Sequence, residues 1–225
     1  MPSAVATTQR SYDTNLRDEA LLLLDKRGKV LDVAREVSRL MRAANIPGAV
    51  IGGIAVVLHG HVRTTKDVDI LAPSPLDPLA DLLVAHGFLF DRKEKAFVKR
   101  GVPVHLVLPE QTGTSLEETV EIEGVTTAPL AVLIEMKLRT GSTNLLRAQD
   151  LADVIGLIRH HRLTGAFARR LDKSLRLAFR KLARMIEKEN AQEATHFPPS
   201  GSAPDTPPKR GSSSSLGAHS TRSEK

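Results

Sequence analysis

The amino-acid sequence predicts a mixed α/β (α+β) fold: a mixed sheet with flanking helices, then a helical C-terminal half, then a disordered tail. Short β-branched runs alternate with helical patterns in the first part of the chain. From Pro129 onward, apolar residues recur at helical spacing. From Ala191 onward, Pro, Ser and Gly dominate and the periodicity ends, which is typical of a segment that cannot offset its chain entropy by burial.

The chain begins with a polar, aperiodic stretch and two expected helices. Apolar residues at helical spacing predict one helix over Asn15–Lys26 and a second over Val30–Ala44. Asn45–Gly48 ends the second helix, because the residue before a proline disfavours helical backbone. We expect these helices to pack against the sheet.

Short apolar runs bounded by turn residues predict the sheet. Helical patterns over Ile54–His59 and Leu76–Ala85 separate the early strands. Pro103 near the start of one run implies an edge or first-residue position, since proline cannot donate to a strand ladder. The expected strands are Ala49–Ile51, Val68–Leu71, Phe88–Phe90, Ala96–Lys99, Val102–Leu108 and Val120–Ile122.

Three helices are expected in the C-terminal half. They cover Pro129–Arg139, with Lys137 on the polar side, then Asn144–His160, and a long basic helix over residues 166–189 with an apolar seam. The domain boundaries that follow are an N-terminal extension (1–28), a core (29–127), a helical region (128–190) and a disordered tail (191–225).

The composition excludes several classes of protein. The chain has 225 residues, of which 41% are hydrophobic and only 3% aromatic, so the core is aliphatic. The absence of cysteine excludes disulfides and thiolate metal sites. With no apolar run of membrane-spanning length and no signal-peptide pattern, we expect a soluble, cytoplasmic protein without a membrane partner.

The net charge of +6 is concentrated in one stretch. Between Arg162 and Glu189 there are nine basic and three acidic residues, so the rest of the chain is neutral overall. A polyanion such as RNA is a conceivable partner for this basic helix. The alternative is an ordinary solvated helix face.

The stretch from Gly52 to Asp69 is the most informative in the chain. A β-branched run ends in Gly52-Gly53 before a helical pattern, which places unpaired backbone N–H groups where a phosphate can bind. Asp67 and Asp69 begin the next strand on one face, about 7 Å apart at the backbone. Two like charges so close are costly unless a cation such as Mg2+ lies between them. The alternative is a glycine turn followed by a solvated Asp pair.

This joint pattern resembles the nucleotidyltransferase superfamily related to DNA polymerase β. The longer string, Gly-Gly-Ile-Ala…His-Gly…Arg-Thr-Thr-Lys-Asp-Val-Asp-Ile-Leu, is most similar to AbiEii-like nucleotidyltransferases, the toxin halves of some toxin–antitoxin pairs. The resemblance covers residues 29–163. It implies that Asp67 and Asp69 hold the metal, Mg2+ or alternatively Mn2+. It also implies an NTP substrate, for which the candidate contacts are Gly52, Gly53, Arg63 and Thr64.

The resembling family has a third carboxylate on a neighbouring strand, and this chain departs from that pattern. The matching position is His105, and Glu110 follows nearby but matches nothing. Histidine can act as a general base near neutral pH, although imidazole suits Mn2+ or Zn2+ better than Mg2+. The alternative is a strand histidine without a role.

A second line of resemblance lies in the helical half. Lys137 matches a family lysine on one helix, and the run from Arg147 to Asp153 matches an Arg-x-x-Asp-x-x-Asp-like pattern on the next. The resemblance implies that Lys137 reaches nucleotide phosphates and that Asp150 orients it or a hydroxyl. The alternative is an ion pair between Arg147 and Asp150 at the surface, worth well under about 1 kcal/mol.

The sequence therefore favours transfer of a nucleoside monophosphate from an NTP to a hydroxyl of RNA, tRNA or protein, with an antitoxin protein as an expected partner of a toxin. The catalytic candidates are Asp67, Asp69, His105, Lys137 and Asp150. One rival is a catalytically silent nucleotide-binding or regulatory protein that has lost the third acid. Another is a nucleic-acid-binding or antitoxin-like module that acts through the basic helix.

Overall fold

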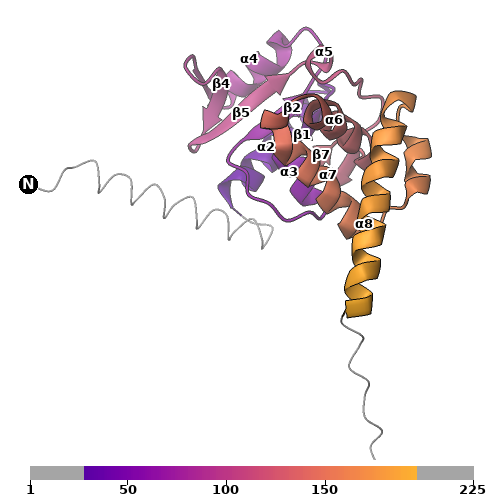
Figure 1. Ribbon diagram of the computed structural model, residues 1–225. Coiled ribbons are helices and arrows are strands. Elements are labelled where there is room, and N and C mark those ends of the chain that lie inside the picture. The colour runs from indigo at the N-terminus through magenta and orange to yellow at the C-terminus, as the bar shows by residue number, and fades with distance from the viewer. Residues whose placement is uncertain (1–27, 197–225) are drawn as a thin grey trace, which may run out of the picture.

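The computed structural model describes residues 28–196, and within them the strands form one seven-stranded mixed sheet in the order β3-β4-β5-β2-β1-β7-β6 (Figure 1). Helices pack on both faces, so the expected mixed α/β fold is confirmed. The helix expected over Asn15–Lys26 lies outside the described residues. The strands are β1 (Ala49–Ile51), β2 (Val68–Leu71), β3 (Leu89–Asp91), β4 (Ala96–Lys99), β5 (Val102–Val107), β6 (Val120–Ile122) and β7 (Val125–Thr127).

The helices also follow most of the expected ranges. In the N-terminal part they are α2 (Lys29–Ala43), α3 (Gly52–Leu58), α4 (Asp77–Ala85) and the short α5 (Pro109–Thr112). In the C-terminal half they are α6 (Leu130–Thr143), α7 (Ala148–His161), α8 (Arg176–His196) and three 3-10 helices, η1 (Leu145–Arg147), η2 (Gly165–Arg170) and η3 (Lys173–Leu175).

Strand β2 lies at the centre of the sheet and fixes the register of its neighbours. It runs antiparallel to β1, with Asp69 opposite Ile51, and parallel to β5, with Asp69 beside His105. On the far side of β1, β7 runs parallel to it, with Thr127 beside Val50. Asp69 therefore lies between the strand that leads into the glycine turn and the strand that carries His105.

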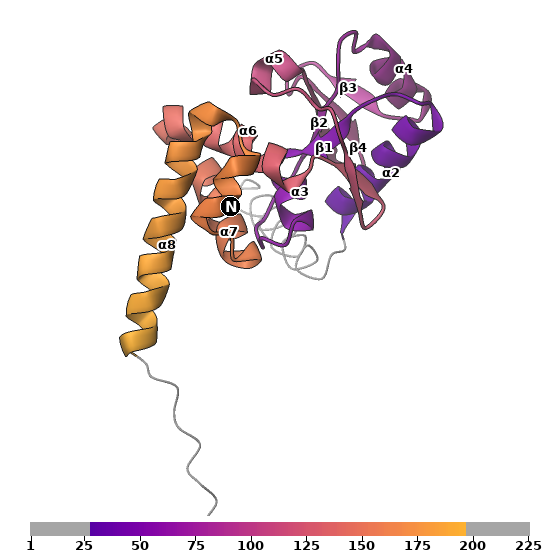
Figure 2. The same ribbon diagram turned by 90° about the vertical axis from the view of Figure 1, so that its right-hand side faces the viewer.

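One face of the sheet is covered by α2 and α4. Side chains from these helices pack with alternate strand residues in a continuous aliphatic core, including Val68, Ile70, Val102 and Val104. Because side chains alternate along a strand, Asp69, between Val68 and Ile70, faces the other way, as does His105, which follows Val104. Figure 2 shows the sheet between α2 and α4 on one side and the helical half on the other.

Strand β5 is an interior strand, so the edge position suggested by Pro103 is wrong. Pro103 is the second residue of β5 and pairs with Val98 of β4, whereas pairing with β2 begins only at Val104. The missing N–H of proline therefore lies beyond the β2 ladder. Strand β7 has no counterpart among the predicted strands, because its three residues are too few to show an alternating pattern.

The basic stretch is not one helix, which corrects the expectation for residues 166–189. It divides into η2, η3 and α8, and Leu171 between the first two is extended. The Asp172 carboxylate accepts the backbone N–H of Ser174 and so starts a new turn. Helix α8 continues through residues 191–196, beyond the predicted start of the tail.

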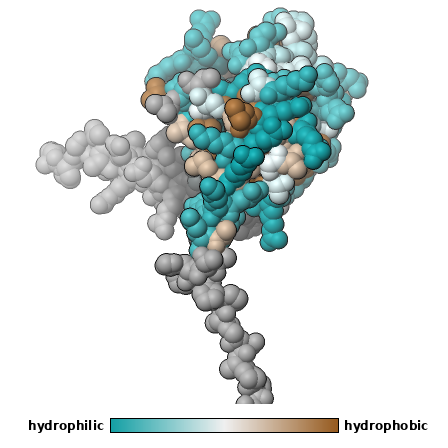
Figure 3. All heavy atoms as spheres, turned by 45° about the vertical axis from the view of Figure 1, so that its right-hand side comes forward, coloured by the Kyte–Doolittle hydropathy of each residue, from teal (hydrophilic) through white to brown (hydrophobic). Residues whose placement is uncertain are grey.

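The helical half has its own core, centred on Phe179 of α8. Phe179 is fully buried among residues of α6, α7 and η2, with the Phe167 ring 5.5 Å away between centroids. The face that includes α8 is otherwise mostly hydrophilic, with isolated apolar residues (Figure 3). None of the helices within residues 28–196 combines the length and apolarity that a membrane span requires.

Truncation of Phe179 tests whether α8 is an integral part of this core. We expect Phe179→Ala to lower the free energy of unfolding by about 3–5 kcal/mol, because it leaves a cavity. Leu177 lies two residues earlier and is 78% exposed, so Leu177→Ala should change stability by no more than about 0.5 kcal/mol. Urea denaturation of both variants measures the difference, and equal small losses would show that α8 packs only loosely.

Candidate active site

The turn from β1 into α3 brings backbone close to the second aspartate. Gly52 has a φ of 66°, a left-handed conformation, and a Cβ at this position would overlap the Asp69 carboxylate. At Gly53, a Cβ would lie 2.5 Å from Thr65 Oγ1 and 3.2 Å from Arg63 Cζ. Both positions therefore require glycine, because the strand with Asp69 and the loop before it lie directly against the turn.

Asp69 lies on the face opposite α2 and α4, and Asp67, which directly precedes β2, is close enough for its charge to act on Asp69. Burial raises the pKa of Asp69 above its ordinary value, and the charge of Asp67 raises it further. His105, Lys137 and Arg147 oppose this rise, so these three side chains are close enough to act on Asp69. Asp67 Oδ1 accepts a hydrogen bond from Thr65 Oγ1 at 2.9 Å, which fixes its carboxylate.

His105 occupies the position beside Asp69 on the neighbouring strand. The parallel register pairs the two residues directly, and both are half-buried. The structure thus brings His105 to the place where the family resemblance puts a third carboxylate. Glu110 is exposed in α5, beyond the end of β5.

Lys137 is buried, not on a polar helix face as the periodicity of α6 predicts. Its Nζ contacts Asp150 Oδ1 at 2.7 Å and Asp153 Oδ2 at 2.9 Å, and both aspartates belong to α7. The two carboxylates compensate the buried ammonium group, which could not stay charged there without them. The lysine is therefore held in place by α7, and its charge acts on Asp69.

Asp150 also holds Arg147 and Thr140. Arg147 Nε donates to Asp150 Oδ2 at 2.9 Å, and Thr140 Oγ1 donates to the same oxygen at 2.7 Å. Burial alone would raise the pKa of Asp150, but the hydrogen bonds from Lys137, Thr140 and Arg147 outweigh it, and the pKa is lowered. Asp150 is therefore a negative anchor for two cations.

Asp153 is the residue of this group whose importance the sequence pattern understates. It is fully buried and accepts hydrogen bonds from Arg63 Nη1 at 2.8 Å and from Gln149 Nε2 at 3.1 Å, besides its contact with Lys137. Arg63 precedes the aspartate pair in the chain, so Asp153 ties that loop to the helical half. We call Arg63, Lys137, Arg147, Asp150 and Asp153 the charged cluster.

The candidate Thr64 and the neighbouring Lys66 are exposed on the same loop. The Thr64 carbonyl accepts a hydrogen bond from Arg63 Nε at 3.1 Å, so its backbone helps to orient the guanidinium group. Both side chains lie at the surface beside the aspartate pair, where a substrate can reach them.

Protein side chains alone do not complete a metal site. Within residues 28–196, no group of three or more His, Asp or Glu side chains is arranged to hold a metal ion. The mutual repulsion of Asp67 and Asp69 nevertheless fits a shared divalent cation. Mg2+ is commonly held by one or two carboxylates together with water and substrate phosphates, so two protein ligands are enough.

His59 and His161 make contacts around the end of α3. His59 Nε2 lies 2.9 Å from the Ala128 carbonyl oxygen, and burial lowers the pKa of this imidazole. His161 Nε2 lies 2.7 Å from the His59 carbonyl oxygen, which joins the end of α7 to the end of α3. These contacts account for the His59 and His161 side chains without a metal.

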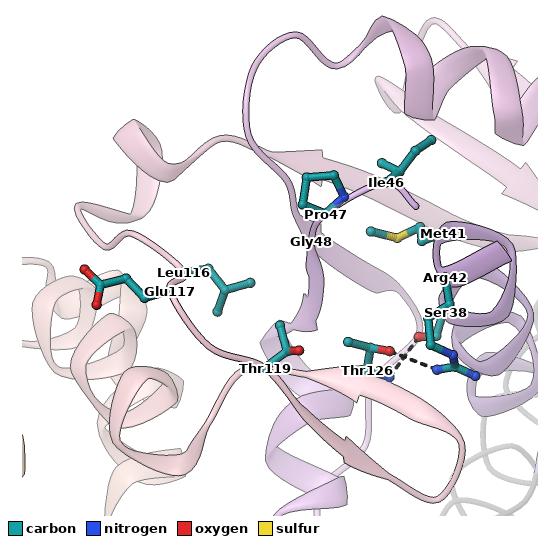
Figure 4. A pocket seen from close by; sticks show the side chains of 10 residues that line it. All are labelled: Ser38, Met41, Arg42, Ile46, Pro47, Gly48, Leu116, Glu117, Thr119 and Thr126. Carbon is teal, nitrogen blue, oxygen red and sulfur yellow. Dashed lines mark hydrogen bonds between the residues drawn. The ribbon is translucent and has the colours of Figure 1, made fainter. Parts of the chain in front are cut away.

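A cavity of about 290 Å3 lies away from the aspartates (Figure 4). It opens between the end of α2, the residues before β1 and the segment that precedes β6. Gly48, which lines it, precedes β1, whereas Gly52 follows β1, so the cavity and the aspartate pair are at opposite ends of that strand. Its lining residues are Ser38, Met41, Arg42, Ile46, Pro47, Gly48, Leu116, Glu117, Thr119 and Thr126.

Comparison with known proteins gives likenesses of structure only. No protein-family model matches the chain, and no curated protein matches it. An antigenic nucleotidyltransferase-like protein from Paracoccidioides brasiliensis is 18% identical over 72% of this chain and 89% of that chain, with a TM-score of 0.48. The antibiotic-resistance factor ANT(2'')-Ia is 11% identical over 72% of this chain and 94% of that chain, with a TM-score of 0.42.

The CCA-adding enzyme of Thermotoga maritima, solved in complex with tRNA, is also similar. It is 14% identical over 83% of this chain and 57% of that chain, with a TM-score of 0.36. Since all three are less than a fifth identical to this chain, the geometry of the site has to carry any functional conclusion. The narrower resemblance to AbiEii-like proteins stays a prediction.

Replacement of Gly52 tests the close approach of the turn to Asp69. Gly52→Ala should destabilise the protein by more than the roughly 1–2 kcal/mol of left-handed backbone strain, because its methyl group also overlaps the carboxylate. Gly87 has a similar φ of 80° with open space around it, so Gly87→Ala should show the backbone strain alone. Urea denaturation compares the two, and equal losses would contradict the described contact.

The raised pKa of Asp69 predicts a gain in stability when its charge is removed. Between the ordinary pKa of 3.8 and the raised value, the folded state binds more protons, so stability falls as the pH rises through this interval. Asp69→Asn should therefore raise the Tm at pH 7 by a few degrees, and the gain should shrink as the pH falls toward 4. Asp81→Asn, at an exposed carboxylate on α4, is the control. A lower Tm for Asp69→Asn at pH 7 would contradict the assignment.

Proposed function

We propose that the protein is a metal-dependent nucleotidyltransferase, which transfers a nucleoside monophosphate from an NTP to a hydroxyl group. One observation carries this proposal. Asp69 lies beside His105 on the sheet face opposite α2 and α4, and Asp67, Lys137 and Arg147 are within electrostatic reach of it. An arrangement with two carboxylates for a cation and fixed positive charge for phosphates suits phosphoryl transfer, which depends on positioning and charge stabilisation.

Asp67 and Asp69 would hold Mg2+, or Mn2+, together with oxygen atoms of the triphosphate. When bound, the ion supplies Lewis-acid stabilisation of the charge that develops on the phosphoryl oxygens. His105 does not complete a three-ligand group within residues 28–196, and two carboxylates with water and phosphate oxygens suit either ion. The choice between the two ions is therefore part of the test.

The residues of the charged cluster would bind and orient the triphosphate. Lys137 and Arg147 stabilise the leaving pyrophosphate, and Asp150 holds both of them at fixed positions. Arg63 is fixed by Asp153 and lies against Gly53, and its guanidinium group would contact phosphate oxygens. Thr64 is exposed on the same loop, and its hydroxyl group would contact the nucleotide.

The chemical step would break a phosphoanhydride bond of the NTP and form a phosphoester bond to the acceptor. The acceptor oxygen bonds to the α-phosphorus, the bond from that phosphorus to the bridging oxygen breaks, and pyrophosphate departs. An imidazole nitrogen of His105 takes the proton of the acceptor hydroxyl, a role for which histidine is suited near neutral pH. This role replaces the carboxylate base expected from the family resemblance.

The proposed acceptor is RNA, and the protein would act as a toxin whose partner is an antitoxin. The basic side chains after α7 support an RNA partner although they do not form one helix, because they are exposed: Arg169, Arg170, Lys173, Arg180, Lys181, Arg184 and Lys188. Neutralising them should weaken RNA binding and reduce its salt dependence. The toxin role rests on the resemblance of residues 29–163 and on nothing else in the fold.

A second candidate function is nucleotide binding without catalysis. The observation that favours it is His105 in place of a third carboxylate, together with the lack of a three-ligand metal group in the described part of the chain. Such a protein would keep the charged cluster for the triphosphate and transfer nothing.

Incubation with labelled NTPs and total RNA, in Mg2+ or Mn2+, tests the activity. We expect incorporation into RNA and a loss of more than about a hundredfold for Asp67→Ala and Asp69→Ala, since even outer-shell changes cost a metal site up to that much. His105→Ala should lower the rate by about 10²–10⁴-fold, as expected for loss of a general base.

Asp81→Ala is the control for these substitutions, because Asp81 is exposed on α4. NTP binding without incorporation under either metal would reject the enzyme and favour the silent nucleotide-binding protein. Growth arrest on expression, relieved by Asp67→Ala, would support the toxin role.

A further inference from the structure

We propose that Thr65 is a positioning residue of the metal site, whose hydroxyl group holds the Asp67 carboxylate in the orientation that a divalent cation requires. This inference rests on the proposed function, because it concerns the same pair of aspartates. It also separates two consecutive threonines. Thr64 is exposed, whereas Thr65 is half-buried and donates a hydrogen bond to Asp67.

The segment between α3 and β2 alternates in exposure along the chain. The side chains of His61, Arg63, Thr65 and Asp67 are half-buried, and the residues between them, at positions 62, 64 and 66, are exposed. Such alternation is typical of extended backbone, in which residues two apart share one side of the chain. Thr65 and Asp67 therefore lie on the same inner side, where the hydroxyl group of the first reaches the carboxylate of the second.

The turn from β1 into α3 fixes the position of Thr65. A Cβ at Gly53 would lie 2.5 Å from Thr65 Oγ1 and 2.7 Å from Thr65 Cβ, so this side chain rests directly on the Gly53 backbone. Arg63 lies against the same glycine and is held there by Asp153. The branch at Cβ also restricts rotation of the threonine side chain about χ1. Thr65 Oγ1 thus donates its hydrogen bond from a fixed place.

Asp67 needs such a partner more than Asp69 does. Asp69 belongs to β2, where strand pairing with β1 and β5 holds its backbone. Asp67 precedes β2 and lies outside this pairing. The last torsion of an aspartate side chain is only weakly restricted by its own chain. The hydrogen bond from Thr65 Oγ1 to Asp67 Oδ1, 2.9 Å long, selects one orientation and leaves Oδ2 for the cation.

A hydroxyl group suits this task because it carries no charge. The Asp150 carboxylate is held by ion pairs with Lys137 and Arg147, and these cations neutralise it. Thr65 instead orients the Asp67 carboxylate and leaves its negative charge available to a metal ion. Carboxylates that bind metals are commonly hydrogen-bonded themselves, and loss of such a partner typically lowers metal affinity by about 10–100-fold.

Titration with Mn2+, followed by the electron paramagnetic resonance signal of the free ion, tests the proposal without NTP. Thr65→Val keeps the shape of the side chain but removes the hydroxyl group, and should weaken Mn2+ binding by about 10–100-fold. Thr65→Ser keeps the hydroxyl group and should bind Mn2+ almost as tightly as the unaltered protein. Thr119→Val is the matched control with unchanged affinity, because Thr119 is an exposed threonine at the cavity away from the aspartates.

A purely structural role for Thr65 would give the opposite order of affinities. If only packing against Gly53 mattered, Thr65→Val would bind Mn2+ normally and Thr65→Ser would be the weaker variant, and this result would overturn the proposal. Thr65→Ala also lacks the hydroxyl group and replaces Thr65→Val if urea denaturation shows that the latter does not fold. In the incorporation assay, saturating Mn2+ should restore the kcat of Thr65→Val, which a misfolded protein could not show.

The outcomes separate this inference from the proposed function. Asp67→Ala should abolish Mn2+ binding. If it does and Thr65→Val has no effect, this inference fails and the metal site stands. If Mn2+ binding depends on both residues but NTP is never incorporated, the positioning role is correct and the proposed transferase is wrong. If the unaltered protein binds no Mn2+, or binds it independently of Asp67, both are wrong.

Discussion

A single buried carboxylate, that of Asp153, joins the two halves of this molecule. It accepts one hydrogen bond from Arg63, in the loop before β2, and contacts Lys137, in α6, while its own helix is α7. Removal of one partner from a buried ion pair leaves an uncompensated charge, which is among the most costly changes in a protein interior. The loop that carries Thr65 and Asp67 therefore has its position set by a helix whose residues come some 90 positions later.

The charges of the cluster around this carboxylate are not balanced, because the cations outnumber the carboxylates. Arg63, Lys137 and Arg147 face only Asp150 and Asp153 within the cluster, which leaves an excess of positive charge. Asp69 and Asp67 lie next to this excess, yet burial and mutual repulsion still raise the pKa of Asp69. The protein alone does not balance the excess positive charge of the cluster or the repulsion between the two aspartates. A bound divalent cation with a polyphosphate would balance both. This is the pattern expected of a site that trades stability for binding.

The local chemistry was predictable from the sequence, and the tertiary partners were not. The glycine turn and the strands of Asp69 and His105 follow from short-range pattern, and the register pairs Asp69 with His105. Asp67 directly precedes the strand that it was expected to begin. Lys137 was expected on a polar face because helical periodicity assigns charged residues to solvent. It is buried because α7 supplies two carboxylates, which periodicity within α6 cannot reveal. The helix break at Leu171 likewise depends on the side-chain cap by Asp172. The spacing of apolar residues cannot predict such a cap.

Helix α3 is only seven residues long, and it belongs to two cores at once. Ile54 and Leu58 pack into the core of the sheet, and Ala55 and Val56 pack into that of the helical half. Neither core can open without exposing one side of this helix to water. The boundary near residue 128 therefore marks a change in architecture and not a line along which the chain can be cut: sheet and helices should melt in one cooperative transition.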